Sequence, residues 1–300
     1  MRKTVRFYEL RCIKKDRGVE TLVDVKGDFW AALGARVGNL QYEDRKISTR
    51  GRKLYGECRE SKSPAKKYFY VGGVRNRSEW PDAINDDTGQ VDSLKTVDVN
   101  ADLIEPTFMV PFGVSNQIAV LSMSFSSPRV SALETWVSGV SGRQSGIDGY
   151  ALIPVINRRV AERLQQASGA MAFRVKVQAD AEIPESGGGV IGEAARVARQ
   201  VSTDTMIELG WSLGNRHGTP ETKSEMLGAA RWVRSDWVKQ AKVTLELPDG
   251  DGFTRERYDL IEEVFTSVQN FDIPADLPPS EMSVLTGIDE AIESFRREFS

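Results

Sequence analysis

The sequence contains one histidine and two cysteines, which rules out or restricts several common kinds of active site. A histidine-rich metal site is impossible, and a Ser-His-Asp triad would have to use His217, although no G-x-S-x-G motif accompanies it. We expect His217, in a polar turn-like stretch, to be a loop residue. Cys12 and Cys58 provide neither a disulfide framework nor a tetrahedral set of metal ligands. The sequence therefore predicts no catalytic residues, no metal and no cofactor, and so a protein that is not an enzyme.

Long hydrophobic runs are also missing from the 300 residues. No apolar stretch approaches the length that crosses a bilayer, so direct membrane insertion is not expected. The opening MRKTVRFYEL is charged and has no apolar segment of the kind that a signal peptide needs. Hydrophobic residues make up 40% of the chain, which is enough for a core, and the numbers of Gly and Pro are ordinary for a globular protein. We expect a soluble, cytoplasmic protein with one large domain or two smaller ones.

Positive charge is concentrated near the N-terminus, although the whole chain is slightly acidic. Residues 1–77 contain 20 Lys and Arg and 9 Asp and Glu, whereas residues 78–300 contain 20 and 34. Nine of the basic residues lie between Asp44 and Tyr70. A basic surface attracts nucleic acid through phosphate contacts and counterion release. The same charge could instead neutralise the acidic part of the chain, within a protomer or across a dimer. A membrane-surface role is weaker, because no basic amphipathic helix with an aromatic face is present.

Hydrophobic alternation predicts a series of strands. The opening strand is expected over 3–10, and two basic strands over 52–60 and 66–74 form a hairpin whose turn contains Pro64. Further strands are expected over 105–114, 116–125, 149–156, 171–179 and 203–213, with a second hairpin over 240–261. Tyr55, Tyr68 and Tyr70 interleave with the basic residues of the first hairpin, where they could stack on bases or simply pack in the sheet.

Helical periodicity predicts helices between these strands, over 27–37, 128–140, 158–167, 187–201, 219–238 and 278–300. Asp28, Ser127 and Thr219 are suitable N-cap residues, and Pro128 and Pro220 suit the first helical position. The predicted fold is α+β, with mostly antiparallel sheets, packed helices and a two-domain protomer. We place a basic-ended α+β domain at 1–182 and a second α+β domain, with the C-terminal helix, at 183–300.

Several segments resemble, in the same order, the RexA family of phage exclusion proteins, which is structurally related to RdgC-type DNA-binding proteins. The resemblance rests on FYELRCIKKDRGVETLVDVKGDFWAALGAR, EPTFMVPFGVSNQIAVLSMSFSSPRVSALETWV, ALIPVI, AFRVKVQADAEIP and the terminal amphipathic helix. The chain departs from the family pattern around 41–67, which is longer and more basic, and in INRRVAERLQQASGA. No individual functional residue is carried over from the family.

The resemblance implies a homodimer that binds double-stranded DNA without sequence specificity. It also implies a prophage-borne role, in superinfection exclusion and anti-phage defence or in the choice between lysis and lysogeny, and a separate membrane partner protein. Two other classes of function stay open. One is a metal-dependent nuclease of a defence system, faintly suggested by Asp24 and Lys26 in VDVKG, and the other is an interaction protein that does not contact DNA.

The basic residues around the first hairpin are the candidate DNA contacts. We expect phosphate contacts from Arg45, Lys46, Arg50, Arg52 and Lys53, and from Lys62, Lys66 and Lys67 at the hairpin tip. Arg158, Arg159 and Arg163 share one side of a predicted helix and are secondary candidates, although a solvated helix surface would look the same.

The C-terminal helix is the candidate dimer interface. Its apolar stripe recurs at spacings of three and four residues and consists of Leu285, Ile288, Ile292, Phe295 and Phe299. About two heptads are present, fewer than a coiled coil needs, so the stripe could equally dock onto the core of its own protomer.

Overall fold

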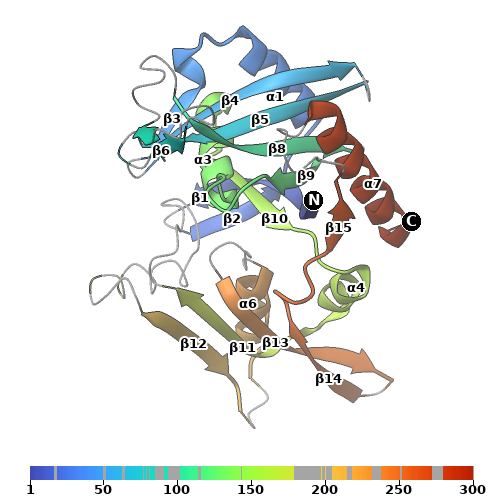
Figure 1. The fold of residues 1–300 in the computed structure, drawn as a ribbon. Helices are drawn as coiled ribbons and strands as arrows, with labels where there is room; N and C mark the ends of the chain where they lie inside the picture. The colour runs from blue at the N-terminus through green and yellow to red at the C-terminus, as the bar shows by residue number, and fades with distance from the viewer. Residues whose placement is uncertain are drawn as a thin grey trace.

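In a computed structural model the described residues form two main antiparallel sheets with helices packed against them (Figure 1), which confirms the expected α+β fold. The structure describes residues 1–16, 19–49, 52–62, 65–76, 78, 80, 82–84, 91–93, 102–113, 116–142, 144–178, 197, 200, 205–214, 218–231, 238–250, 252–271 and 280–299.

The larger sheet has nine strands and is organised around the long strand β1 (Arg2–Asp16). Its main path runs β10 (Gly149–Pro154), β1, β9 (Gln117–Ser122), β8 (Ile104–Phe112), β5 (Ala65–Val74), β4 (Arg52–Lys62) and β3 (Lys46–Thr49). Two further strands, β2 (Val19–Asp24) and β15 (Thr266–Asn270), also pair with β1. The strands β6 (Asp82–Ile84) and β7 (Val91–Ser93) form a separate two-stranded sheet.

One face of the large sheet is covered by α1 (Phe29–Asn39) and α3 (Val130–Ser141). The α1 helix begins as expected, because Asp28 Oδ1 accepts a hydrogen bond from the main-chain N–H of Ala31 at 3.1 Å. Trp136 of α3 packs over Gly56, where an added Cβ would lie 2.3 Å from the indole ring. The absence of a side chain at this position therefore lets the helix approach the sheet closely.

The predicted N-cap of α3 was wrong. The helix begins at Val130 after Arg129, whose side chain forms no capping hydrogen bond. Ser127 instead donates its hydroxyl to the main-chain oxygen of Pro106 at 2.8 Å and accepts from the N–H of Ser124 at 3.0 Å. Because this hydroxyl holds the preceding loop together, it does not cap the helix.

The other face of the large sheet is covered by α7 (Glu281–Phe299). The apolar stripe predicted as a dimer interface lies inside this core, since Leu285, Ile288, Ile292 and Phe295 are 0%, 0%, 2% and 4% exposed. The Phe295 ring stacks on Phe7 of β1 with 4.7 Å between ring centroids. These four residues pack within their own protomer, so the stripe is not a free surface for a second copy.

The smaller sheet has the order β12 (Met206–Ser212), β11 (Gly169–Gln178), β13 (Val238–Asp249), β14 (Gly252–Asp259). It has its own apolar core, to which α4 (Arg158–Gln166) and α6 (Pro220–Arg231) contribute Leu164 and Leu227. The expected start of α6 is confirmed, because Thr219 Oγ1 accepts from the N–H of Thr222 at 3.3 Å.

The two sheets do not divide the chain at residue 182. The smaller sheet begins with β11, which precedes that boundary, whereas β15 and α7 return the end of the chain to the large sheet. The first core therefore uses residues from both ends of the sequence. The helix predicted over 187–201 lies almost wholly outside the described residues.

Candidate nucleic-acid interface

The basic hairpin is present, but its candidate residues do not form one surface. Strands β4 and β5 pair from Lys53 opposite Val74 to Lys62 opposite Ala65. Lys53 and Lys62 are therefore roughly 30 Å apart, since a strand rises about 3.3 Å per residue. They also point to opposite faces of the sheet, because nine positions separate them and side chains alternate. The local charge in the sequence is thus divided between two ends and two faces.

At the first of these ends, two candidates are held by their neighbours. Arg45 donates its Nε–H to the main-chain oxygen of Leu40 at 2.9 Å. Lys46 forms an ion pair with Glu43 at 2.9 Å and lies 3.7 Å from the centroid of the Tyr42 ring. The hydrogen bond to Glu43 raises the pKa of Lys46. Lys53 is exposed, and Arg50 lies outside the described residues.

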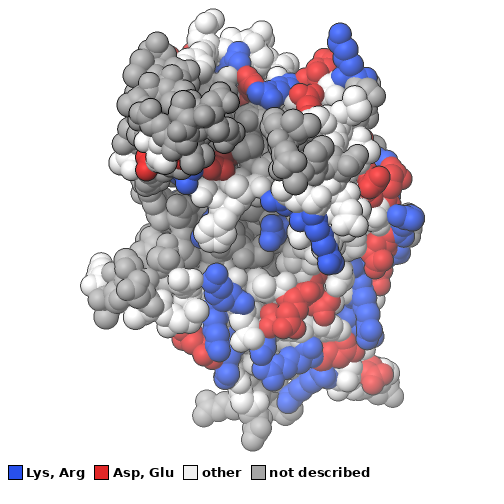
Figure 2. Space-filling model, in the orientation of Figure 1, with Lys and Arg blue, Asp and Glu red and all other residues white. Residues whose placement is uncertain are grey.

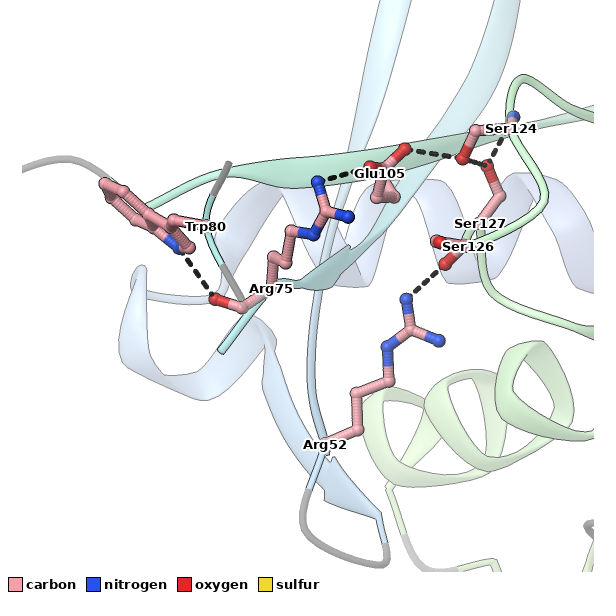
Figure 3. Close-up of polar contacts among 7 residues, drawn as sticks. All are labelled: Arg52, Arg75, Trp80, Glu105, Ser124, Ser126 and Ser127. Atoms are coloured by element: carbon pink, nitrogen blue, oxygen red, sulfur yellow. Dashed lines mark hydrogen bonds and ion pairs between the residues drawn. The ribbon is translucent and has the colours of Figure 1, made fainter. Parts of the chain in front are cut away.

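Arg52 holds the structure together rather than pointing into solvent. Its guanidinium donates to the main-chain oxygen of Ser126, in the loop that precedes α3 (Figure 3). The same loop is bound from the sheet by Glu105, which accepts from the Ser124 hydroxyl at 2.5 Å and lies 3.8 Å from the Arg75 guanidinium. This use of the Arg52 side chain argues against a direct phosphate contact.

At the tip of the hairpin, Lys66 forms an ion pair, whereas Lys62 and Lys67 form none with the described residues. Lys66 forms an ion pair with Asp289 of α7. Burial lowers the pKa of Lys66, and the nearby charge of Arg296 adds to this effect. Lys62 and Lys67 are exposed, and neither forms an ion pair with another residue in the described part of the chain.

The tyrosines of the hairpin pack or bond within the sheet. Tyr55 donates its hydroxyl to Glu57 at 2.9 Å, and the Arg59 guanidinium lies 3.9 Å from the centre of the Tyr70 ring. Tyr68 is fully buried beneath α7. In this structure these rings serve packing and pairing, and Tyr68 is not accessible for stacking on bases.

The three arginines of α4 also differ from one another. Arg158 pairs with Glu162 of the same helix at 3.0 Å, and Arg163 lies 3.5 Å from Glu256 of β14. Arg159 is exposed, and no ion pair joins it to another described residue. The secondary candidates are thus brought close together, with Arg159 the best placed to contact a ligand.

The sequence reasoning missed a basic face on the smaller sheet. Its inner face carries Phe173 and Val175 in the core, and the register places five cationic side chains together on the opposite face of three adjacent strands. These residues are Arg174, Lys176, Lys242, Arg255 and Arg257. Figure 2 shows Lys and Arg, with Asp and Glu between them, over the lower part of the molecule, where Figure 1 draws this sheet.

This set of five residues, called here the basic sheet face, is only partly neutralised. Glu208 of β12 lies 3.4 Å from Arg174 and 3.5 Å from Lys176. Lys242 lies opposite Asp259, whose carboxylate accepts main-chain N–H groups of Ala241 and Ile261. Arg255 and Arg257 are exposed on the edge strand β14. The charged and apolar alternation of FRVKV and the spacing of TRERYD were the signals that could have revealed this face.

No protein-family model matches the chain, and no curated protein is significantly similar to it. No three His, Cys, Asp or Glu side chains of the described residues lie close enough together to hold a metal ion. Within the same residues, no helix is both long and apolar enough to cross a membrane.

Proposed function

We propose that the chain binds double-stranded DNA without sequence specificity, mainly through the basic sheet face. The observation that carries this proposal is the register of β11, β13 and β14, which aligns five cations on one side of a sheet whose other side is core. Lysine and arginine contacts to phosphates supply affinity but carry no sequence information. The exposed Lys62, Lys67 and Arg159 are additional contacts.

The resemblance to the RexA family extends this proposal to the cell. We assign the chain a role in phage exclusion or in the lytic–lysogenic choice of a prophage, as a cytoplasmic homodimer that acts beside a separate membrane protein. A dimer would bring two basic sheet faces to one duplex and raise the affinity through avidity. Such a dimer uses a surface other than the buried stripe of α7.

The test is the salt dependence of binding to a random duplex, measured by fluorescence anisotropy. The variant Lys242→Ala/Arg255→Ala/Arg257→Ala removes three cations from the basic sheet face. Each lost phosphate contact should reduce the slope of log affinity against log salt by about 0.9, so the slope should fall by nearly three. The matched control is Arg2→Ala/Lys14→Ala/Lys26→Ala. It removes three exposed cations, two from β1 and one from the loop after β2.

Equal affinity and equal slope for the wild type and the Lys242, Arg255 and Arg257 variant would refute the basic sheet face as the DNA surface. The same reactions with Mg²⁺ or Mn²⁺ test the nuclease alternative, because a nuclease would cut the duplex once the metal is added. A chain that neither binds nor cuts DNA would leave the interaction-protein alternative.

A further inference from the structure

A cavity of about 530 Å³ lies on the α3 side of the large sheet. Its floor comes from β1, β9 and β15, and its walls are the loop before α3 and the connection from β14 to β15. We call it the α3 cavity. Its volume falls within the range of about 300–1,000 Å³ that is typical of small-molecule sites.

Arg6 lies on the floor of the α3 cavity. The sheet register places it between Val120 of β9 and Thr266 of β15, so these three side chains share one face. Neighbouring Val5 and Phe7 point to the opposite face, into the core beneath α7. Arg6 is exposed although it lies in the middle of a sheet, and it forms no ion pair with any other residue that the structure describes. A cation is thus held on a rigid strand and faces the cavity.

The loop before α3 forms a wall whose shape is fixed by hydrogen bonds. Figure 3 shows Arg52 reaching Ser126, Ser124 bonded to Ser127, and Ser124 bonded to Glu105 of β8. Ser127 also donates its hydroxyl to the main-chain oxygen of Pro106 in the same strand. At the end of this loop Arg129 is exposed and lines the cavity. The second cation of the cavity is therefore also held by a well-braced segment.

Phe125 belongs to the same loop, lines the cavity and is 94% exposed. A phenyl ring left in water forgoes the stabilisation that burial of its apolar surface would provide. The ring projects from a loop that is bonded on both sides of it, through Ser124 and Ser126. A flat apolar ring beside two arginines suits a ligand that has both a flat ring and an anionic group.

We propose that the α3 cavity binds a nucleoside phosphate. Phe125 stacks on the base, Arg6 and Arg129 bind the phosphate, and Glu262, the carboxylate of the lining, accepts from the sugar hydroxyls. Two sources supply this chemistry, a free nucleotide and the phosphorylated end of a nucleic-acid strand. The proposal does not depend on duplex binding, because the cavity and the basic sheet face share no residue.

The test is calorimetric titration of the full chain with AMP, adenosine, inorganic phosphate and a short single strand with or without a 5′ phosphate. AMP should bind more tightly than adenosine or phosphate alone. Phe125→Ala should weaken AMP binding about tenfold and leave phosphate binding unchanged, since stacking acts on the base. Arg6→Ala and Arg129→Ala should each weaken AMP and phosphate alike. Phe253→Ala, which removes an exposed ring from β14, is the matched control.

The protein could bind the 5′-phosphorylated single strand of nucleic acid without binding free AMP. If Phe125→Ala then abolishes binding of the strand, the ligand of the cavity is the phosphorylated end of a nucleic-acid strand. The proposal is wrong if neither AMP nor the phosphorylated strand binds, or if the three cavity variants bind like the wild type. The Lys242, Arg255 and Arg257 variant should retain AMP binding, and the cavity variants should retain duplex binding. Failure of one proposal is therefore distinguishable from failure of the other.

Discussion

The Arg52 guanidinium donates a hydrogen bond to the main-chain oxygen of Ser126 and ties the start of β4 to the loop before α3. The two residues are 74 positions apart in the sequence. The side chain also passes over Gly73, where an added Cβ would lie 2.5 Å from the guanidinium. The sheet therefore holds this arginine in place, and its charge serves the loop.

Replacing Arg52 with Ala should lower the free energy of unfolding by about 1–2 kcal/mol, because a hydrogen bond to a charged group is lost and a carbonyl loses its donor. The slope of duplex affinity against salt should stay unchanged. Urea denaturation and anisotropy provide the two measurements. Lys53→Ala, at the next and exposed position, is the control and should change stability by less than about 0.5 kcal/mol. A salt slope that falls in Arg52→Ala would restore Arg52 as a phosphate contact.

The hairpin tip gives a second prediction, which separates lysines that are neighbours in the sequence. Lys62→Ala/Lys67→Ala should reduce the salt slope of duplex binding by nearly two, because both side chains are exposed and carry no ion pair with described residues. Lys66→Ala should leave the slope unchanged, since Asp289 already neutralises this lysine. Equal effects of the double and the single variant would show that the ion pair with Asp289 opens when DNA binds.

Local signals in the sequence predicted much of the fold. The expected strands at 52–60 and 66–74 correspond to β4 and β5, and the expected C-terminal helix corresponds to α7. Asp28 and Thr219 cap their helices as predicted. In each case the pattern acts over a few neighbouring residues, through alternation, helical spacing or a cap. The prediction that Ser127 caps α3 was wrong because its hydroxyl donates instead to the main-chain oxygen of Pro106 in β8, which is distant in the sequence.

Pairing between residues that are far apart in the chain could not be predicted from the sequence. Strand β15 pairs Thr266 with Arg6, and its five residues carry no local signal that distinguishes a strand from a loop. The partner of Lys66 is 223 positions away, so no spacing rule could show that this charge is neutralised. The basic sheet face was missed for a related reason. The net charge of residues 78–300 is negative, so a sum over the sequence hides these cations. The strand register gathers them on one face of the smaller sheet.

Three buried or partly buried tyrosines predict a loss of stability at alkaline pH. Burial raises the pKa of Tyr68, Tyr70 and Tyr150 above the ordinary value of about 10. Above about pH 10 the unfolded chain loses phenol protons that the native protein keeps. The contribution of these phenols to the free energy of unfolding is therefore fully present below about pH 9 and is progressively lost above pH 10. The lowered pKa of Lys66 acts in the opposite direction, but it is one group against three.

Urea denaturation between about pH 8 and pH 11 measures this effect, together with the ultraviolet absorbance of tyrosinate in the native protein. Tyr68→Phe should make the decline shallower, since it removes the phenol whose pKa is raised furthest of the three. Tyr42→Phe, at an exposed position, is the control and should leave the decline unchanged. Stability that is constant up to pH 11 would contradict the prediction.

The stripe of α7 gives the last prediction, because a core position and an interface position respond differently to charge. Ile288 and Ile292 are 0% and 2% exposed and pack in the core between α7 and the large sheet. Ile288→Glu/Ile292→Glu places two carboxylates there without partners, at a cost of several kcal/mol for each buried charge. We expect cooperative loss of the native fold, seen as a lower urea midpoint or as aggregation. Met282→Glu, at a 59% exposed position of the same helix, should leave stability within about 0.5 kcal/mol of the wild type. A folded, monomeric double variant with weakened DNA binding would instead return the stripe to the dimer interface.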